Sequence, residues 1–193
     1  MEYQKNGTIF KLDEKLDQKV NQLDSLEKIV EMQRKALINR RDFLNNYNNT
    51  YWSAEEVNGQ VVIELKNDII FNTGSSVVSA NGKETIGSIA TALNSIDEPI
   101  EIWVIGHTDD RQYNTENKDN WELSAERALS VVRTFITNDL EPSIITAAAK
   151  SKYKPEMNNT SATRRQMNRR TEIVVVPTES PYSTIEQLMA EKI

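Results

Sequence analysis

The sequence predicts a two-layer α/β sandwich, with helices on one face of a sheet, preceded by an amphipathic helix of coiled-coil type. Between residues 61 and 176, apolar residues follow the order strand, helix, strand, helix, strand. This order favours helices layered on a sheet. Before it, apolar residues recur every seven positions from residue 12 to residue 44. That repeat is typical of a coiled coil.

The leading helix presents a narrow apolar stripe. One set of heptad positions is apolar throughout: Leu16, Leu23, Val30, Leu37 and Leu44. The partner positions hold Leu12 and Leu26, but also Lys19, Gln33 and Arg40, which weakens a strict two-stranded seam. The helix therefore either packs on its own domain or pairs with a second copy. The narrow stripe favours a homodimer, and we assign residues 1–45 to this segment.

An asparagine-rich stretch after residue 45 ends the helix, since asparagine is a poor helix former. We assign residues 46–60 to a linker and a first turn, which contains the hairpin dipeptide Asn58-Gly59. The predicted domain covers residues 61–177 and ends at Pro177. Residues 178–193 form a tail in which we expect a short amphipathic helix.

Within the domain, three segments read as strands and two as helices. The strands are predicted at residues 61–65, 100–105 and 172–176, which are rich in valine and isoleucine. Apolar residues at helical spacing predict helices over residues 86–93 and 128–136.

Composition excludes several classes of protein. The net charge of −6 and the pI near 5.0 argue against a general nucleic-acid binder, which would have a basic surface. The chain has no cysteine and one histidine, so disulfides and a histidine-rich metal site are excluded. We expect no cofactor. No stretch approaches the roughly 18–20 apolar residues of a membrane span, and none reads as a signal peptide.

Three short motifs carry the most information about function. They are Gly-His-Thr-Asp at residues 106–109, Asn-Trp-Glu-Leu-Ser-Ala-Glu-Arg-Ala at 120–128, and Arg-Gln-Met-Asn-Arg-Arg-Thr-Glu at 165–172. In this order they resemble the OmpA-like peptidoglycan-binding domain of OmpA, of the Pal lipoprotein and of MotB-type stator subunits. The resemblance covers about residues 60–176, and the second motif is most similar to the MotB branch. It implies the OmpA-like form of the predicted sandwich.

The resemblance implies that Asp109 and Arg127 hold the diaminopimelate of a peptidoglycan stem peptide. This ligand carries an ammonium and a carboxylate on one carbon, so it needs an anion and a cation that binds in a bidentate manner. Asp109 comes directly after a predicted strand. Arg127 lies near the start of the next helix, which we expect Ser124 to cap. Spacing alone would also fit a surface ion pair contributing at most ~1 kcal/mol.

The resemblance extends to further residues. Asn120 matches an asparagine that contacts the ligand, with an ordinary turn residue as the alternative. Asn72 and Thr73 fall where the family has an aspartate and a small residue beside the stem peptide, and asparagine removes a charge there. Arg169 matches an arginine that reaches the site from the last helix, whereas Arg170 is expected to support the fold.

Some residues depart from the family pattern or invite other interpretations. Ala149-Lys150-Ser151 replaces a Gly-x-Gly segment of the family. His107 lacks an accompanying nucleophile motif, so we assign it to support of the turn rather than to catalysis. Trp121 is read as a core or rim aromatic in preference to a sugar platform.

The predicted function is non-catalytic peptidoglycan binding that anchors a MotB-like stator subunit of an ion-driven motor to the cell wall. The alternative is an OmpA- or Pal-type tether between envelope layers. A wall hydrolase would need a metal site or a paired acid and base, and neither is evident. A purely structural oligomerisation protein is a further class. The function implies a periplasmic protein with an inner-membrane motor partner, and we expect an anchor upstream of Met1.

Overall fold

The computed structural model describes residues 2–47, 52–57, 60–72, 74–96, 99–113 and 119–178, with side chains in the first helix described for residues 9–31. The described residues divide into two units, one within residues 2–39 and the other within residues 40–178. The predicted hairpin turn Asn58-Gly59, the site residue Thr73 and the predicted tail helix lie outside the described residues.

The first helix, α1, spans Glu2–Tyr47 and is longer than the predicted heptad segment. Leu16, Leu23 and Val30 of the stripe are 62%, 60% and 62% exposed. The side chains of Leu37 and Leu44 lie outside the described set. Within the described residues, no helix combines the length and the apolar character that crossing a membrane requires.

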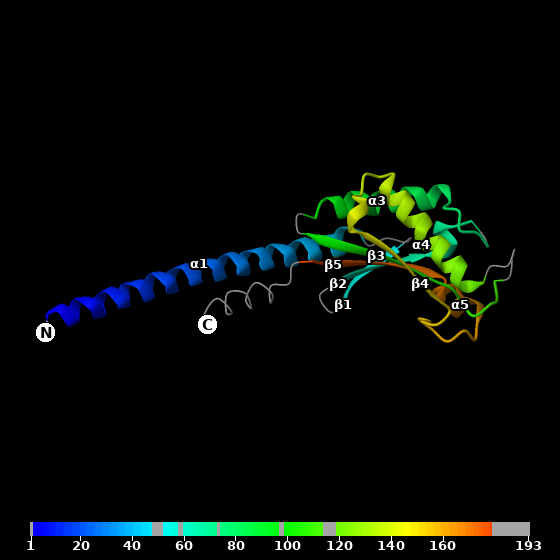
Figure 1. Cartoon of the computed structure of the whole chain (residues 1–193). Coiled ribbons are helices and arrows are strands. Elements are labelled where there is room, and N and C mark those ends of the chain that lie inside the picture. Colours follow the sequence, from blue (N-terminus) through cyan, green and yellow to red (C-terminus); the bar gives the residue numbers. More distant parts are fainter. Residues whose placement is uncertain are drawn as a thin grey trace. The chain divides into compact units, whose positions relative to one another are not determined.

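The second unit is built on a five-stranded sheet with the order β1-β2-β5-β3-β4 (Figure 1). Strands β3 and β4 are parallel, and the other neighbours are antiparallel. The strands are β1 (Trp52–Val57), β2 (Gln60–Lys66), β3 (Ile100–His107), β4 (Ile145–Ser151) and β5 (Arg170–Pro177).

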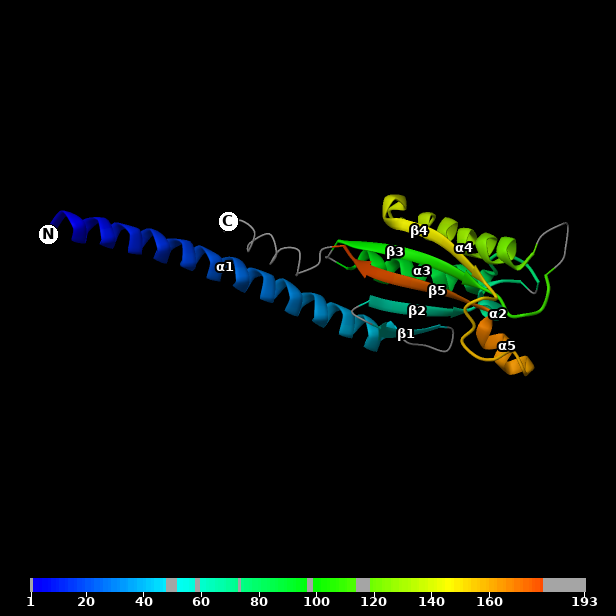
Figure 2. The ribbon, with the colours of Figure 1, turned by 60° about the horizontal axis from the view of Figure 1, so that its bottom comes forward.

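Two long helices cover one face of this sheet, as Figures 1 and 2 show. They are α3 (Ala80–Asn94) and α4 (Asn120–Ile136), and the shorter helices are α2 (Asn67–Ile70) and α5 (Ala162–Asn168). A 3-10 turn at Pro142–Ile144 precedes β4. The predicted α/β two-layer sandwich is confirmed.

Alternation along the strands builds the core between the layers. In β3, Ile102 and Val104 are fully buried, whereas Trp103 between them is 42% exposed. Because successive strand residues point to opposite faces, Ile102 and Val104 meet the helices and Trp103 points away from them. Helices α3 and α4 contribute the apolar residues of their inward faces: Ile86, Ile89, Leu93, Ala128, Val131 and Phe135.

Two strands were not predicted. β1 falls inside the predicted linker 46–60, yet it pairs with β2 and buries Trp52 to 2% exposure. The second half of β1 is mostly polar, so its sequence does not show the alternation of apolar and polar residues that predicts a strand. β4 is rich in alanine, which is depleted in strands. Its pairing with β3 is decided by the tertiary structure.

Candidate functional site

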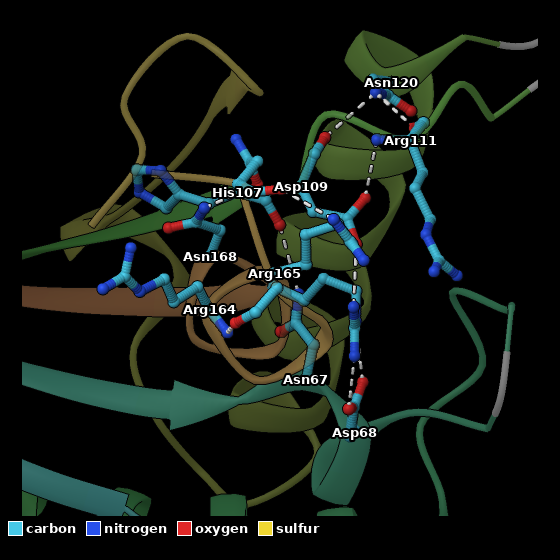
Figure 3. Close-up of polar contacts among 12 residues, drawn as sticks. Asn67, Asp68, His107, Asp109, Arg111, Asn120, Arg164, Arg165 and Asn168 are labelled. Carbon is cyan, nitrogen blue, oxygen red and sulfur yellow. Dashed lines mark hydrogen bonds and ion pairs between the residues drawn. The ribbon is translucent and has the colours of Figure 1, made fainter. Parts of the chain in front are cut away.

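Four elements meet at one end of the sheet. Asp109 lies two residues beyond β3, Asp68 lies in α2, Arg169 immediately precedes β5, and Arg127 lies in the second turn of α4. Figure 3 shows Asp109 between Asn120 and Arg111 on one side and Asp68 on the other. Residues far apart in the sequence thus form one charged cluster.

Gly106 allows α4 to approach this end of β3. A Cβ atom at this position would lie 2.0 Å from the carbonyl oxygen of Ser124, so only glycine fits without displacing the helix. The helix starts with a capping box formed by Asp119 and Glu122. The prediction that Ser124 caps α4 is therefore wrong. Its hydroxyl instead accepts a 3.2 Å hydrogen bond from the Ser151 N–H and connects α4 to the end of β4.

Asp109 is a buried acceptor, with 5% of its surface exposed. Its Oδ1 accepts a 3.1 Å hydrogen bond from the backbone N–H of Arg111, and its Oδ2 accepts a 2.7 Å bond from Nη1 of Arg169. An ionised carboxylate has about four acceptor positions. Asp109 therefore keeps acceptor capacity for a cationic group of a ligand.

Arg169 joins Asp109 to Asp68. Its Nε and Nη2 donate to the two carboxylate oxygens of Asp68 at 3.0 and 2.7 Å, in the bidentate geometry that suits a guanidinium. The hydrogen bonds to Asp68, together with the bond to Asp109, raise the pKa of Arg169 despite its partial burial. Sequence reasoning missed Asp68. The one feature of the sequence that could have indicated Asp68 is its position directly before the apolar run at residues 69–71.

Arg127 is also buried, with 5% of its surface exposed. Its Nε donates to the carbonyl oxygen of Ser75 at 3.1 Å, and its guanidinium carbon lies 5.3 Å from the centroid of the Phe71 ring. Burial lowers the pKa of Arg127, while the nearby charge of Asp68 opposes this effect. Arginine nevertheless stays charged at neutral pH.

Arg127 and Asp109 do not neutralise each other. Among the described residues, no carboxylate lies within ion-pair distance of Arg127, and Asp109 pairs with Arg169 instead. The alternative of a simple Asp109–Arg127 surface pair is therefore wrong. Burying a cation such as the Arg127 guanidinium without a carboxylate partner costs free energy, unless the anion of a ligand pairs with it.

Asn120 organises the loop that carries Asp109. Its Nδ2 donates to the carbonyl oxygens of Asp109 at 3.3 Å and Arg111 at 3.0 Å, and its Oδ1 accepts a 3.0 Å bond from the Tyr113 N–H. The side chain is 7% exposed. All of these bonds go to backbone groups of the loop. Asn120 therefore has the role of a turn residue, whether or not it also contacts a ligand.

Asn72 lies at the turn between α2 and α3. Its side chain is exposed, its N–H donates to the carbonyl oxygen of Val77 at 3.2 Å, and its own carbonyl accepts a 3.0 Å bond from Ser75. Gly74, with φ of 65°, provides the left-handed residue of this turn. The turn thereby presents the Ser75 carbonyl oxygen to Arg127.

His107 and Arg170 belong to a separate, buried cluster around Glu172. Nε2 of His107 lies 3.3 Å from Glu172, and Nε of Arg170 donates to that carboxylate at 3.1 Å. Burial raises the pKa of Glu172, but the interactions with His107 and Arg170 outweigh it and lower the pKa to about 2. His107 is fully buried, and in Figure 3 its ring lies apart from the Asp109 carboxylate.

Ser151 adopts a backbone conformation that favours glycine. Its φ is 51°, and it occupies the last position of the segment that replaces the family's Gly-x-Gly. Its carbonyl oxygen accepts a 2.9 Å bond from the Thr108 N–H, next to Asp109. The serine that replaces a glycine of the family pattern therefore places backbone strain next to the site.

A model of the OmpA family matches residues 70–169, just over half of the 193-residue chain. The chain belongs to the OmpA family. The match contains the whole charged cluster except Asp68. In the described part of this OmpA family chain, no group of three or more histidine, cysteine, aspartate or glutamate side chains is placed to hold a metal ion.

Known proteins resemble the chain beyond the family model. It is 31% identical over 184 residues to the uncharacterized protein YtxE of Bacillus subtilis, and the match covers 93% of the chain and 75% of YtxE. It is 31% identical over 119 residues to Motility protein B of the same organism, covering 61% of the chain and 45% of that protein.

The fold resembles the crystal structure of a MotB-like protein from Desulfovibrio vulgaris, with a TM-score of 0.68 and 25% identity over 80% of this chain and 96% of the other. The predicted likeness to the MotB branch of the family is therefore confirmed.

Proposed function

We propose that this chain binds peptidoglycan without catalysis, through the diaminopimelate of the stem peptide. The observation that carries the proposal is the pair of buried, opposite charges, Asp109 and Arg127, which share one site without neutralising each other. Such a pair fits a ligand that has an ammonium and a carboxylate on one carbon. Membership of the OmpA family supports the proposal.

In the proposed complex, the ligand ammonium donates to the free acceptor positions of Asp109, and the ligand carboxylate accepts from the guanidinium of Arg127. Both side chains are already held by hydrogen bonds and burial, so little conformational freedom is lost on binding. Arg169 and Asp68 keep the Asp109 carboxylate in place. Thr73, Asn72 and Asn120 remain proposed contacts at the rim.

The chemistry of the site favours binding over hydrolysis. Asp109 accepts hydrogen bonds from an arginine and from a backbone N–H, an arrangement that suits a fixed anion rather than a proton donor. His107 lies in the Glu172 cluster, where it contacts that carboxylate. These groups hold charge in position, and we propose that they do no more than this.

The likeness to Motility protein B favours a role as the periplasmic, wall-anchoring part of a MotB-like stator subunit, acting with an inner-membrane motor partner, over an OmpA- or Pal-type tether. The chain spans less than half the length of that motility protein. The motor role is therefore proposed separately from wall binding. Restoration of motility in a cell that lacks its own stator subunit tests it.

Wall binding is tested by co-sedimentation with insoluble sacculi that contain diaminopimelate. Asp109→Ala is expected to weaken retention by about 2–5 kcal/mol, the usual cost of removing one partner of a desolvated charge pair. Asp110→Ala is the matched control, because Asp110 is the exposed neighbour and its loss changes the net charge equally. Equal retention of the Asp109 variant and the control would show that the site is misassigned.

A second arm tests the role of Arg127. Sacculi whose stem peptides carry lysine keep the ammonium but lack the carboxylate, so they are expected to retain less protein than diaminopimelate sacculi. Equal retention on both materials would mean that Arg127 does not recognise that carboxylate.

A further inference from the structure

Two exposed aromatic rings stack at the end of the domain that carries the charged site. The rings of Trp121 and Tyr153 have centroids 5.6 Å apart and planes inclined by 29°. Trp121 is 45% exposed and Tyr153 is 69% exposed, and neither belongs to the hydrophobic core. Single exposed aromatics are common, but core packing does not require two water-facing rings that stack on each other, and the outer faces of such a pair remain available to a ligand.

Backbone connections place this pair beside Asp109. Trp121 directly follows Asn120, whose side chain donates to the Asp109 carbonyl oxygen. Tyr153 lies two residues beyond Ser151, which accepts a hydrogen bond from Thr108. In Figure 2, the start of α4 and the end of β4 lie at the same end of the sheet.

The chemistry of the pair suits a saccharide ring. A pyranose has a face of C–H groups that packs on the electron-rich face of an aromatic ring, and hydroxyl groups at its edge that need polar partners. Lys152 supplies such a partner, with its Nζ 5.9 Å from the centroid of the Tyr153 ring. The acidic net charge makes a nucleobase a poor alternative.

In place of the core or rim role expected for Trp121 from the sequence, we propose that Trp121 and Tyr153 form a platform for an N-acetylhexosamine of the glycan strand. This inference rests on the proposed function, because the stem peptide ties the glycan to the diaminopimelate. A chain of about three residues reaches roughly 10 Å, so a sugar can meet the platform while the diaminopimelate occupies the Asp109–Arg127 site. The sugar then adds affinity through the tether rather than through a separate binding event.

Calorimetry with two soluble ligands tests the platform. One is a tripeptide that ends in diaminopimelate, and the other is the same tripeptide attached to its N-acetylhexosamine disaccharide. The full-length chain is expected to bind the disaccharide form roughly three- to tenfold more tightly, as one aromatic stacking contact allows. Trp121→Ala should remove this gain and leave tripeptide affinity unchanged.

Trp103→Ala is the matched control. Trp103 is 42% exposed, and it lies in β3 six residues before Asp109, or roughly 20 Å along an extended chain. It should keep the full gain from the disaccharide. Tyr153→Ala gives a second variant at a highly exposed position, should Trp121→Ala fail to fold.

The outcomes separate the two proposals. A gain that persists in the folded Trp121 or Tyr153 variants would overturn the platform, as would equal affinity of the unmodified chain for both ligands. If the unmodified chain bound neither ligand, the proposed function itself would fail. Tripeptide binding that is lost in Arg127→Gln, together with a disaccharide gain that is lost in Trp121→Ala while its tripeptide binding is kept, would support both.

Discussion

Nη1 of Arg169 lies 2.7 Å from Oδ2 of Asp109, so the acid that the motif pairs with Arg127 is held by an arginine 60 positions further along the chain. The other two nitrogens of this guanidinium, Nε and Nη2, donate hydrogen bonds to Asp68. This leaves Arg127 as the cation of the site that no described carboxylate pairs with. The arrangement explains how one acid and one arginine can remain available together for a zwitterion.

Asp68 should act through Arg169. Asp68→Asn keeps the side-chain shape but weakens the two bonds that aim Nη1 at Asp109. Because Asp68 is 40% exposed, we expect wall retention to weaken by only about 1 kcal/mol, which is less than for Asp109→Ala. Co-sedimentation with sacculi measures this, alongside thermal unfolding to show an intact fold. A loss as large as that of Asp109→Ala would indicate direct contact between Asp68 and the ligand.

Arg127 should not tolerate lysine. Arg127→Lys keeps a positive charge, but an ammonium cannot present two parallel N–H donors to a carboxylate. We expect binding of a tripeptide ending in diaminopimelate to weaken at least tenfold, or by about 1.4 kcal/mol. Calorimetry on the variant measures this, with Arg133→Lys, an exposed arginine on the same helix, as the control. Unchanged affinity would reduce Arg127 to a simple positive charge.

Replacing Ser151 with glycine should stabilise the domain. The φ of 51° at Ser151 is unfavourable for a residue with a Cβ atom, so Ser151→Gly is expected to stabilise the domain by about 0.5–1 kcal/mol. Urea unfolding measures the change, and Ser151→Ala, which removes the hydroxyl but keeps the Cβ atom, is the control. If the glycine variant were no more stable than the alanine variant, the backbone would not be strained at this position.

Glu172 should make stability depend on pH in the acid range. Its pKa in the folded state is about 2, below its ordinary value of 4.5. The unfolded chain therefore takes up this proton first as the pH falls. The stabilisation is fully present above pH 4.5 and is lost as the pH falls through 2.

Urea unfolding of the parent protein and of Glu172→Gln at several pH values tests this effect. The stability difference between the two should shrink as the pH falls from 4.5 to 2. This comparison separates Glu172 from other carboxylates, including Glu64, whose pKa is raised by burial. A difference that does not vary with pH would contradict the expectation.

The apolar stripe of α1 should form a homodimer through residues 12–44. Leu16, Leu23 and Val30 are each at least 60% exposed, and an isolated helix gains little stability from propensity alone. Light scattering is expected to show a dimer for the full chain and a monomer for residues 48–193. Two wall-binding sites on one dimer would also raise retention by avidity. A monomeric full chain would contradict the dimer.

The sequence by itself determined the fold class, the family and the acid and arginine of the proposed clamp. Hydrophobic periodicity is local, so α3, α4 and the central strands could be read from spacing alone. The family could be recognised because each of the three motifs occupies a short, continuous stretch of the chain. Periodicity and motifs of this kind depend on residues that are close together in the sequence.

Only the tertiary structure decided which charges meet. Asp68 and Arg169 are 101 positions apart, and no periodic pattern in the sequence predicts that they pair. The same holds for β1 and β4, whose polar or alanine-rich sequences form strands because β2 and β3 offer them hydrogen bonds. The strain at Ser151 and the stacking of Trp121 on Tyr153 likewise follow from packing. A linear pattern does not encode such contacts, because they arise only when distant segments share one end of a sheet.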